Sequence, residues 1–163
     1  MVSRAVFIAL LLAGGFYVGL SAGALPATVA SHFDAAGRPN GFMARDSYRI
    51  FMLLFVVGLP ALVVTLMSRV FRRGERLNLP HRDYWLAPPQ RQASLDYLVA
   101  HAQWFGSALV VFLCLVHRLV LRANALQPPR LPGPMFGSTV APMLLFMVLW
   151  VGALMLRFGR KPG

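Results

Sequence analysis

Residues Leu98–Leu121, LVAHAQWFGSALVVFLCLVHRLVL, decide the fold of this chain. The stretch is almost wholly apolar, and a helix of this length crosses about 30 Å of hydrocarbon. Three further apolar blocks of comparable length are Ala5–Leu25, Ile50–Val70 and Met135–Leu156. In lipid only helices and closed barrels satisfy their own backbone groups, and continuous apolar runs are typical of helices. We therefore predict an all-α membrane protein with four transmembrane helices.

Composition agrees with a membrane protein. Of the 163 residues, 58% are hydrophobic and 13% are charged, whereas about 25% are charged in a soluble domain. No internal repeat is visible, and the chain is too short for the two inverted halves of a typical secondary transporter. We predict one four-helix domain over residues 1–163, with an outer loop at 26–47 and a cytoplasmic loop at 71–97. Within the cytoplasmic loop, the prolines indicate extended backbone before a new helix that begins near Pro89.

The first apolar block also resembles a secretory signal peptide. Arg4 precedes it, and the small residues Ala22-Gly23-Ala24 follow as in a cleavage site. The apolar stretch is longer than the hydrophobic region of a usual signal peptide. We therefore expect it to be retained as the first membrane helix.

The net charge is +11, and the position of the basic residues matters more than their number. The two termini and the second loop carry ten Lys and Arg residues, and the first and third loops carry six. The positive-inside rule then places both termini and the second loop in the cytoplasm. A basic cluster in a membrane protein favours anionic headgroups over nucleic acid. We expect it to contact the lipid bilayer through Arg69, Arg72, Arg73 and Arg76.

Two sets of spaced residues predict helix packing. Gly15, Gly19 and Gly23 share one helical face and would let another backbone approach closely. That backbone is a helix of the same chain, a membrane protein partner or a second copy in a homo-oligomer. The second set is a polar seam spaced by 4, 3, 4 and 3 residues, which places it on one helical face toward the interior. The seam consists of Gln103, Ser107, Val110, Cys114 and His117. Its polar side chains either form hydrogen bonds between helices or line a path for a ligand or protons.

Residues 25–45 form a polar loop between two apolar blocks. The need to lie in a lipid bilayer does not account for the sequence of this loop. Asn40-Gly41 is a strong turn signal and Ala36-Gly37 a weaker one. Thr28–Phe33 and Phe42–Ala44 are expected to form short extended arms, so we predict a compact cap with a small hairpin. His32 has three interpretations: a structural hydrogen bond to Asp34 or the backbone, a pH-responsive or ligand contact, or a metal ligand.

Two motifs in order along the chain carry a family resemblance. The first consists of Leu25, Pro26, His32, Phe33, Gly37, Pro39 and Gly41, and the second, in the next loop, of Pro80, Asp83, Tyr84, Trp85 and Pro88. The first motif and the helix that follows it resemble the domain of unknown function DUF 1648, found at the start of SdpI-type immunity proteins, over roughly residues 5–65. The second motif is similar to a segment in small bacterial members of the same group. Phe42 stands near the place where that family often has a tryptophan.

The resemblance implies a multi-pass protein of the bacterial cytoplasmic (inner) membrane, most of whose relatives are uncharacterised. The SdpI type protects a cell from a secreted toxin and can hold a transcriptional repressor at the membrane. That type is longer and has helices that this chain lacks.

The residues themselves indicate no enzyme. The sequence holds no HExxH, GxSxG, phosphate-binding glycine loop or cysteine cluster, and we expect no catalytic residue, metal or cofactor. The pairs His32 with His117 and His81 with His101 are conceivable metal or haem sites by topology alone. Our leading hypothesis is a non-enzymatic membrane protein that acts in recognition, immunity or signalling through the outer loop. An accessory or assembly subunit of a larger complex is the alternative, and a small oligomeric transporter is third.

Overall fold

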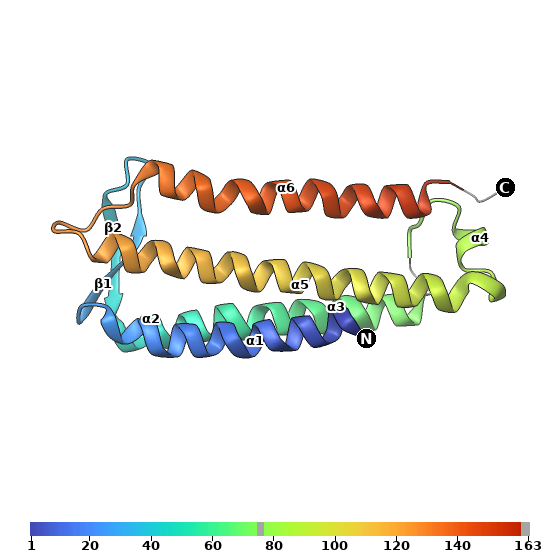
Figure 1. Cartoon of the computed structure of the whole chain (residues 1–163), viewed down its shortest axis with the longest axis horizontal. Helices are drawn as coiled ribbons and strands as arrows, with labels where there is room; N and C mark the ends of the chain where they lie inside the picture. The colour runs from blue at the N-terminus through green and yellow to red at the C-terminus, as the bar shows by residue number, and fades with distance from the viewer. Residues whose placement is uncertain (75–76, 161–163) are drawn as a thin grey trace.

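The computed structural model describes residues 1–74 and 77–160, and its helices are long and antiparallel (Figure 1). Four helical spans are long and apolar enough to cross a membrane, which confirms the predicted fold class. The first is α1 (Val2–Ser21) with the short turn η1 (Ala22–Ala24), and the second joins α2 (Arg45–Leu53), η2 (Leu54–Gly58) and α3 (Leu59–Arg73). The third is α5 (Pro88–Asn124) and the fourth α6 (Gly133–Phe158).

The helices extend beyond the apolar blocks that predicted them. The apolar block of the third span was expected at 98–121, and α5 begins ten residues earlier at Pro88, next to the predicted helix start near Pro89, because proline suits the first helical turn. Much of the predicted loop at 71–97 is therefore helical, and it also contains the short helix α4 (Arg82–Trp85). On the other side, the predicted loop at 26–47 ends early because α2 begins at Arg45.

The core lies among three of the four spans. α5 packs against α1 and α3, and Phe7, Val18, Val64 and Val110 are buried between them. α6 lies on the far side of α5 from α1 and α3, and it packs chiefly against α5 (Figure 1). The molecule is thus a three-span core with a fourth helix attached to one member.

One π-helical turn interrupts the second span at Leu54–Gly58. Pro60 causes it, because proline has no N–H to donate and its ring clashes with the carbonyl four residues earlier. That carbonyl belongs to Val56, whose side chain is fully buried in the core. α1 approaches this point through Gly14, where a Cβ atom would lie only 2.9 Å from Val56 Cγ1.

A second apolar cluster closes the end of the molecule that carries α4. Trp85 is buried there against Leu95, Leu98 and Phe158. Its indole Nε1–H donates to the Phe158 carbonyl oxygen at 3.2 Å, and the Arg157 guanidinium lies 4.6 Å from the centre of its ring. The loop before α5 is therefore folded onto the end of α6.

Candidate functional site

The candidate site is the hairpin between the first two spans, formed by antiparallel strands β1 (Thr28–Phe33) and β2 (Pro39–Ala44). Its turn is at Asp34–Gly37, which contains the weaker predicted signal Ala36-Gly37, so the stronger signal at Asn40-Gly41 was wrong. Asp34 Oδ1 accepts the backbone N–H groups of Ala36 at 2.9 Å and Arg38 at 2.8 Å. Gly37 has φ +75°, the left-handed region that favours glycine.

Gly41 has a different use, inside β2. It pairs with His32 of β1, and a Cβ atom at Gly41 would lie 3.0 Å from His32 Cβ. Glycine is therefore selected here by close cross-strand approach and not by turn geometry. Asn40-Gly41 is a turn signal only in isolation, and the side-chain hydrogen bonds of Asp34 decide where the chain reverses.

The hairpin is attached to α5 by Asn124, which sequence reasoning missed. Its Oδ1 accepts from the Ala30 N–H at 2.9 Å, and its Nδ2 donates to the Ala30 carbonyl at 2.9 Å. Ala30 lies opposite Phe42, and at non-hydrogen-bonded pairs of an antiparallel ladder both backbone groups point away from the partner strand. The Asn124 amide therefore pairs with the outer edge of β1 as a third strand would.

Two further contacts fix the hairpin. At its tip, the Leu131 N–H in the loop before α6 donates to the Gly37 carbonyl at 2.9 Å. At its base, Arg45 Nη1 donates to the Leu25 carbonyl at 3.1 Å, and the Arg45 backbone N–H bonds the Ala27 carbonyl at 3.0 Å. The cap is thus held by the second and third spans and by the loop between α5 and α6.

A buried polar cluster lies on the core side of the hairpin, centred on His117. The His117 ring is fully buried, with Nε2 2.9 Å from Ser21 Oγ and Nδ1 2.9 Å from the Tyr48 hydroxyl. The Ser21 hydroxyl donates its single hydrogen to the Tyr17 carbonyl at 2.6 Å, so toward His117 it can only accept. The hydrogen between Ser21 Oγ and His117 Nε2 must therefore be carried by Nε2. In the neutral imidazole, Nδ1 then accepts from the Tyr48 hydroxyl. This chain of bonds joins three spans.

The tip of the hairpin leaves a cavity of about 490 Å³ against the start of α6. Its walls include Phe33 and Gly37 of the cap and Leu131 and Phe136 from the opposite side. Asp34 is also among its lining residues, although its Oδ1 accepts the Ala36 and Arg38 N–H groups of the turn. The lining is therefore mostly apolar with one acidic residue.

The residues of the first motif divide into structural and exposed positions. Leu25 is buried in the core, and Gly37 is buried at the turn, whereas Pro26 and His32 are exposed. His32 Nδ1 lies 3.1 Å from Ser31 Oγ. Phe33 and Pro39 are half-buried and face each other across the strands.

The polar seam of α5 lies where the spacing placed it. Gln103 Oε1 accepts from Ser3 Oγ of α1 at 2.7 Å, and the buried Ser107 hydroxyl donates to the Gln103 carbonyl at 2.9 Å. Cys114 lies beside α1, since its Sγ would be 3.2 Å from a Cβ atom at Gly14. Gln103 and Ser107 of the seam thus form hydrogen bonds within the bundle.

The predicted glycine face contacts little of the chain. A Cβ atom at Gly15 would lie 3.1 Å from Val57 Cγ2, but at Gly19 and Gly23 it would meet no described atom within 4 Å. The close intrachain approach uses Gly14 instead.

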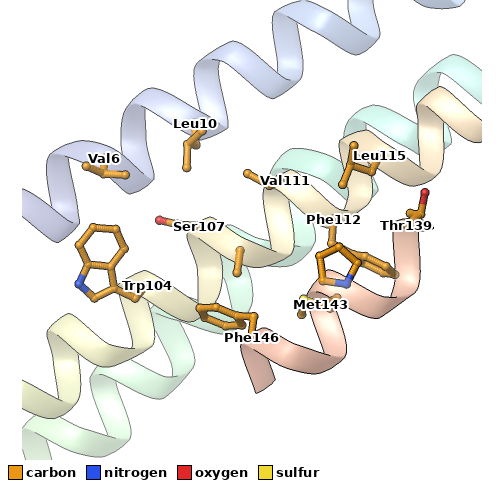
Figure 2. Close-up of a pocket in the computed structure, with 12 residues that line it drawn as sticks. Val6, Leu10, Trp104, Ser107, Val111, Phe112, Leu115, Thr139, Met143 and Phe146 are labelled. Carbon is orange, nitrogen blue, oxygen red and sulfur yellow. The ribbon is translucent and has the colours of Figure 1, made fainter. Parts of the chain in front are cut away.

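An apolar cleft of about 310 Å³ opens between α1, α5 and α6 (Figure 2). Val6 and Leu10 of α1, Trp104 and Val111 of α5 and Met143 of α6 are among its walls. The only polar side chains besides the Trp104 indole are the hydroxyl groups of Ser107 and Thr139. Such a surface suits hydrocarbon and holds no group for acid–base chemistry.

The second motif lies at the other end of the molecule, in and around α4. Trp85 is buried and Tyr84 half-buried, whereas Pro80, Asp83 and Pro88 are exposed. Of the predicted basic cluster, Arg69, Arg72 and Arg73 are exposed on α3, and Arg76 lies outside the described residues.

The histidine pairs do not assemble into a metal centre in the described part of the chain. Over residues 1–74 and 77–160, no three His, Cys, Asp or Glu side chains come together. Both ring nitrogens of His117 contact hydroxyl groups. His101 Nε2 bonds the Trp150 carbonyl at 2.9 Å, and His81 Nε2 lies 3.3 Å from the Gly159 carbonyl.

Comparison with known proteins gives one result. No curated protein and no solved structure matches the chain. Residues 6–58 match the family described as Domain of unknown function (DUF1648). They comprise most of the first span, the hairpin and the second span as far as its π-helical turn. This third of the chain, which contains the first motif, is therefore similar to the domain family that the motif predicted.

Proposed function

We propose that this chain is a non-enzymatic membrane protein whose hairpin cap recognises a partner at the membrane surface. The observation that carries the proposal is the fixation of the cap. A connection between two helices needs neither the Asn124 amide nor the Leu131 bond, yet both hold the hairpin in one place. Fixed loops that present side chains are typical of recognition sites.

The surface offered for recognition combines an exposed ring, an exposed imidazole and the cavity at the tip. Phe42 is 59% exposed on β2, and His32 is exposed on β1. Aromatic side chains often anchor binding interfaces because they bury a large area with few rotatable bonds. The basic residues favour placing both termini in the cytoplasm and the cap on the outer side of a bacterial cytoplasmic membrane. Immunity, as in the SdpI type, stress sensing and signalling are the roles such a cap would serve.

Site-specific photocrosslinking in the native membrane tests the proposal. A photoreactive phenylalanine analogue at Phe42 should give an adduct of discrete mass, and His32→Ala in the same chain should remove it without lowering the protein level. The analogue at Leu145, exposed on α6, reports lipid and random neighbours. The same adducts from both positions, or an adduct unchanged by His32→Ala, would contradict recognition by the cap.

A second function, an accessory or assembly subunit of a larger complex, is favoured by the glycine face of α1. A Cβ atom at Gly19 or Gly23 meets nothing in the described chain, so another backbone has room to approach. Purification in mild detergent should then yield a stoichiometric partner that Gly19→Leu releases. A monodisperse monomer from the wild-type chain would argue against this function.

A further inference from the structure

A basic cavity lies between α1, α3 and α5, at the opposite end of the core from the hairpin. It measures about 260 Å³ and is lined by three arginines, Arg4 of α1 with Arg69 and Arg72 of α3. No carboxylate is among its lining residues, whose remaining members are Val64, Thr65, Ser68, Val99 and Gln103.

The lining of the cavity is partly apolar. Val64 and Val99 are both buried and are its apolar members. Arg72 lies eight residues after Val64 on α3, which is about 12 Å along a helix. The residues that line the cavity therefore cover a distance along α3 comparable to the change from headgroup to hydrocarbon.

A fixed hydrogen-bond donor adds to the three cations. Gln103 Oε1 is occupied by Ser3 Oγ at 2.7 Å, which orients the amide. Its NH2 group bonds no acceptor among the described residues, so it is left for an anion. The Ser68 and Thr65 hydroxyls stand on the same wall.

We propose that this cavity binds one anionic phospholipid carrying two phosphates, with the start of an acyl chain against Val64 and Val99. Guanidinium groups bind phosphate through paired N–H donors. Three of them in one cavity exceed the charge of a single phosphodiester, and basic pockets between transmembrane helices suit such headgroups. A general attraction to the membrane surface needs neither a cavity nor buried valines beside the arginines.

Adjacent arginines supply a matched test. Arg72 lines the cavity and Arg73 does not, yet both are exposed on the last turn of α3. Native mass spectrometry of the delipidated full chain, titrated with diphosphatidylglycerol, measures the affinity. We expect Arg72→Gln to lower it about tenfold and Arg73→Gln to change it less than about twofold. If Arg72→Gln folds poorly, Arg4→Gln, at the chain end, should show the same loss of affinity.

Two further arms test the two-phosphate headgroup and the cavity itself. Phosphatidylglycerol, with one phosphate, should bind at least about tenfold more weakly. Ser68→Leu fills the cavity without changing charge and should also weaken diphosphatidylglycerol binding. Equal losses for Arg72→Gln and Arg73→Gln, equal affinity for the two lipids, or normal binding by Ser68→Leu would each overturn the proposal.

Discussion

Replacing Asn124 with alanine should free the hairpin while leaving the spans in place. The change removes three hydrogen bonds, two to Ala30 and one to the Val120 carbonyl. Ala30 is buried, so its N–H and carbonyl lose their partner where water has poor access. Each buried group left without a partner costs about 1–3 kcal/mol, and part of this is recovered at the membrane surface. We expect the hairpin's opening free energy to fall by about 2–4 kcal/mol.

Hydrogen–deuterium exchange in lipid nanodiscs measures this loss locally. Since 1.4 kcal/mol corresponds to about a factor of ten, amide exchange in the β1 and β2 peptides should accelerate about 30- to 700-fold. Amides in the middle of α3 should keep their protection. Asn40→Ala is the matched control, because Asn40 is exposed on β2. Exchange in the hairpin that is equal for the two variants would refute the role assigned to the Asn124 amide.

Two other substitutions probe the core. His117→Phe leaves the buried Tyr48 hydroxyl without its partner and should cost about 1–3 kcal/mol, visible as a lower thermal midpoint, whereas an unchanged midpoint would contradict the bond network. Gly14→Leu would drive a side chain into the core and should prevent a stable monodisperse protein, whereas Gly19→Leu should leave the melting temperature in detergent unchanged. Equal stability of these two glycine variants would refute the assignment of the tight helix contact.

The four spans were predictable because hydrocarbon thickness sets one length and one polarity for all of them. Helix ends were less predictable, since a helix continues in water once it has begun. α5 runs ten residues before the apolar block at Leu98, and its polar first turns match no hydropathy signal, so its start was indicated only by the prolines near residue 89. The orientation in the membrane inferred from the positive-inside rule stays a prediction, because the fold is the same whichever side each end faces.

The hairpin shows where local signals fail. Both arms were predicted near their positions, but the stronger turn signal, Asn40-Gly41, lies inside β2, and the chain reverses at Asp34–Gly37, which contains the weaker signal Ala36-Gly37. Dipeptide preferences describe an isolated chain, whereas the observed turn also meets the Leu131 N–H from a loop about a hundred residues away. No local rule contains that contact.

Asn124 could have been found by extending a pattern already present. Gln103, Val110, His117 and Asn124 are separated by seven residues each, so they share one face of α5. The predicted seam stops at His117, and Asn124 lies three residues beyond the end of the apolar block at Leu121. A polar residue that continues a seven-residue series just beyond an apolar block is therefore a candidate member of the same seam.

Anchoring determines how the cap would bind. Because Asn124, Leu131 and Arg45 already hold the backbone, a partner meets a formed surface and does not need to order a loop. Ordering on binding would weaken affinity, so a formed cap favours recognition with little movement of its backbone. Loosening the hairpin by Asn124→Ala should then weaken binding of any partner captured at Phe42, even though Asn124 itself is buried and makes no contact with that partner. The cap and α5 would in that case act as one recognition unit.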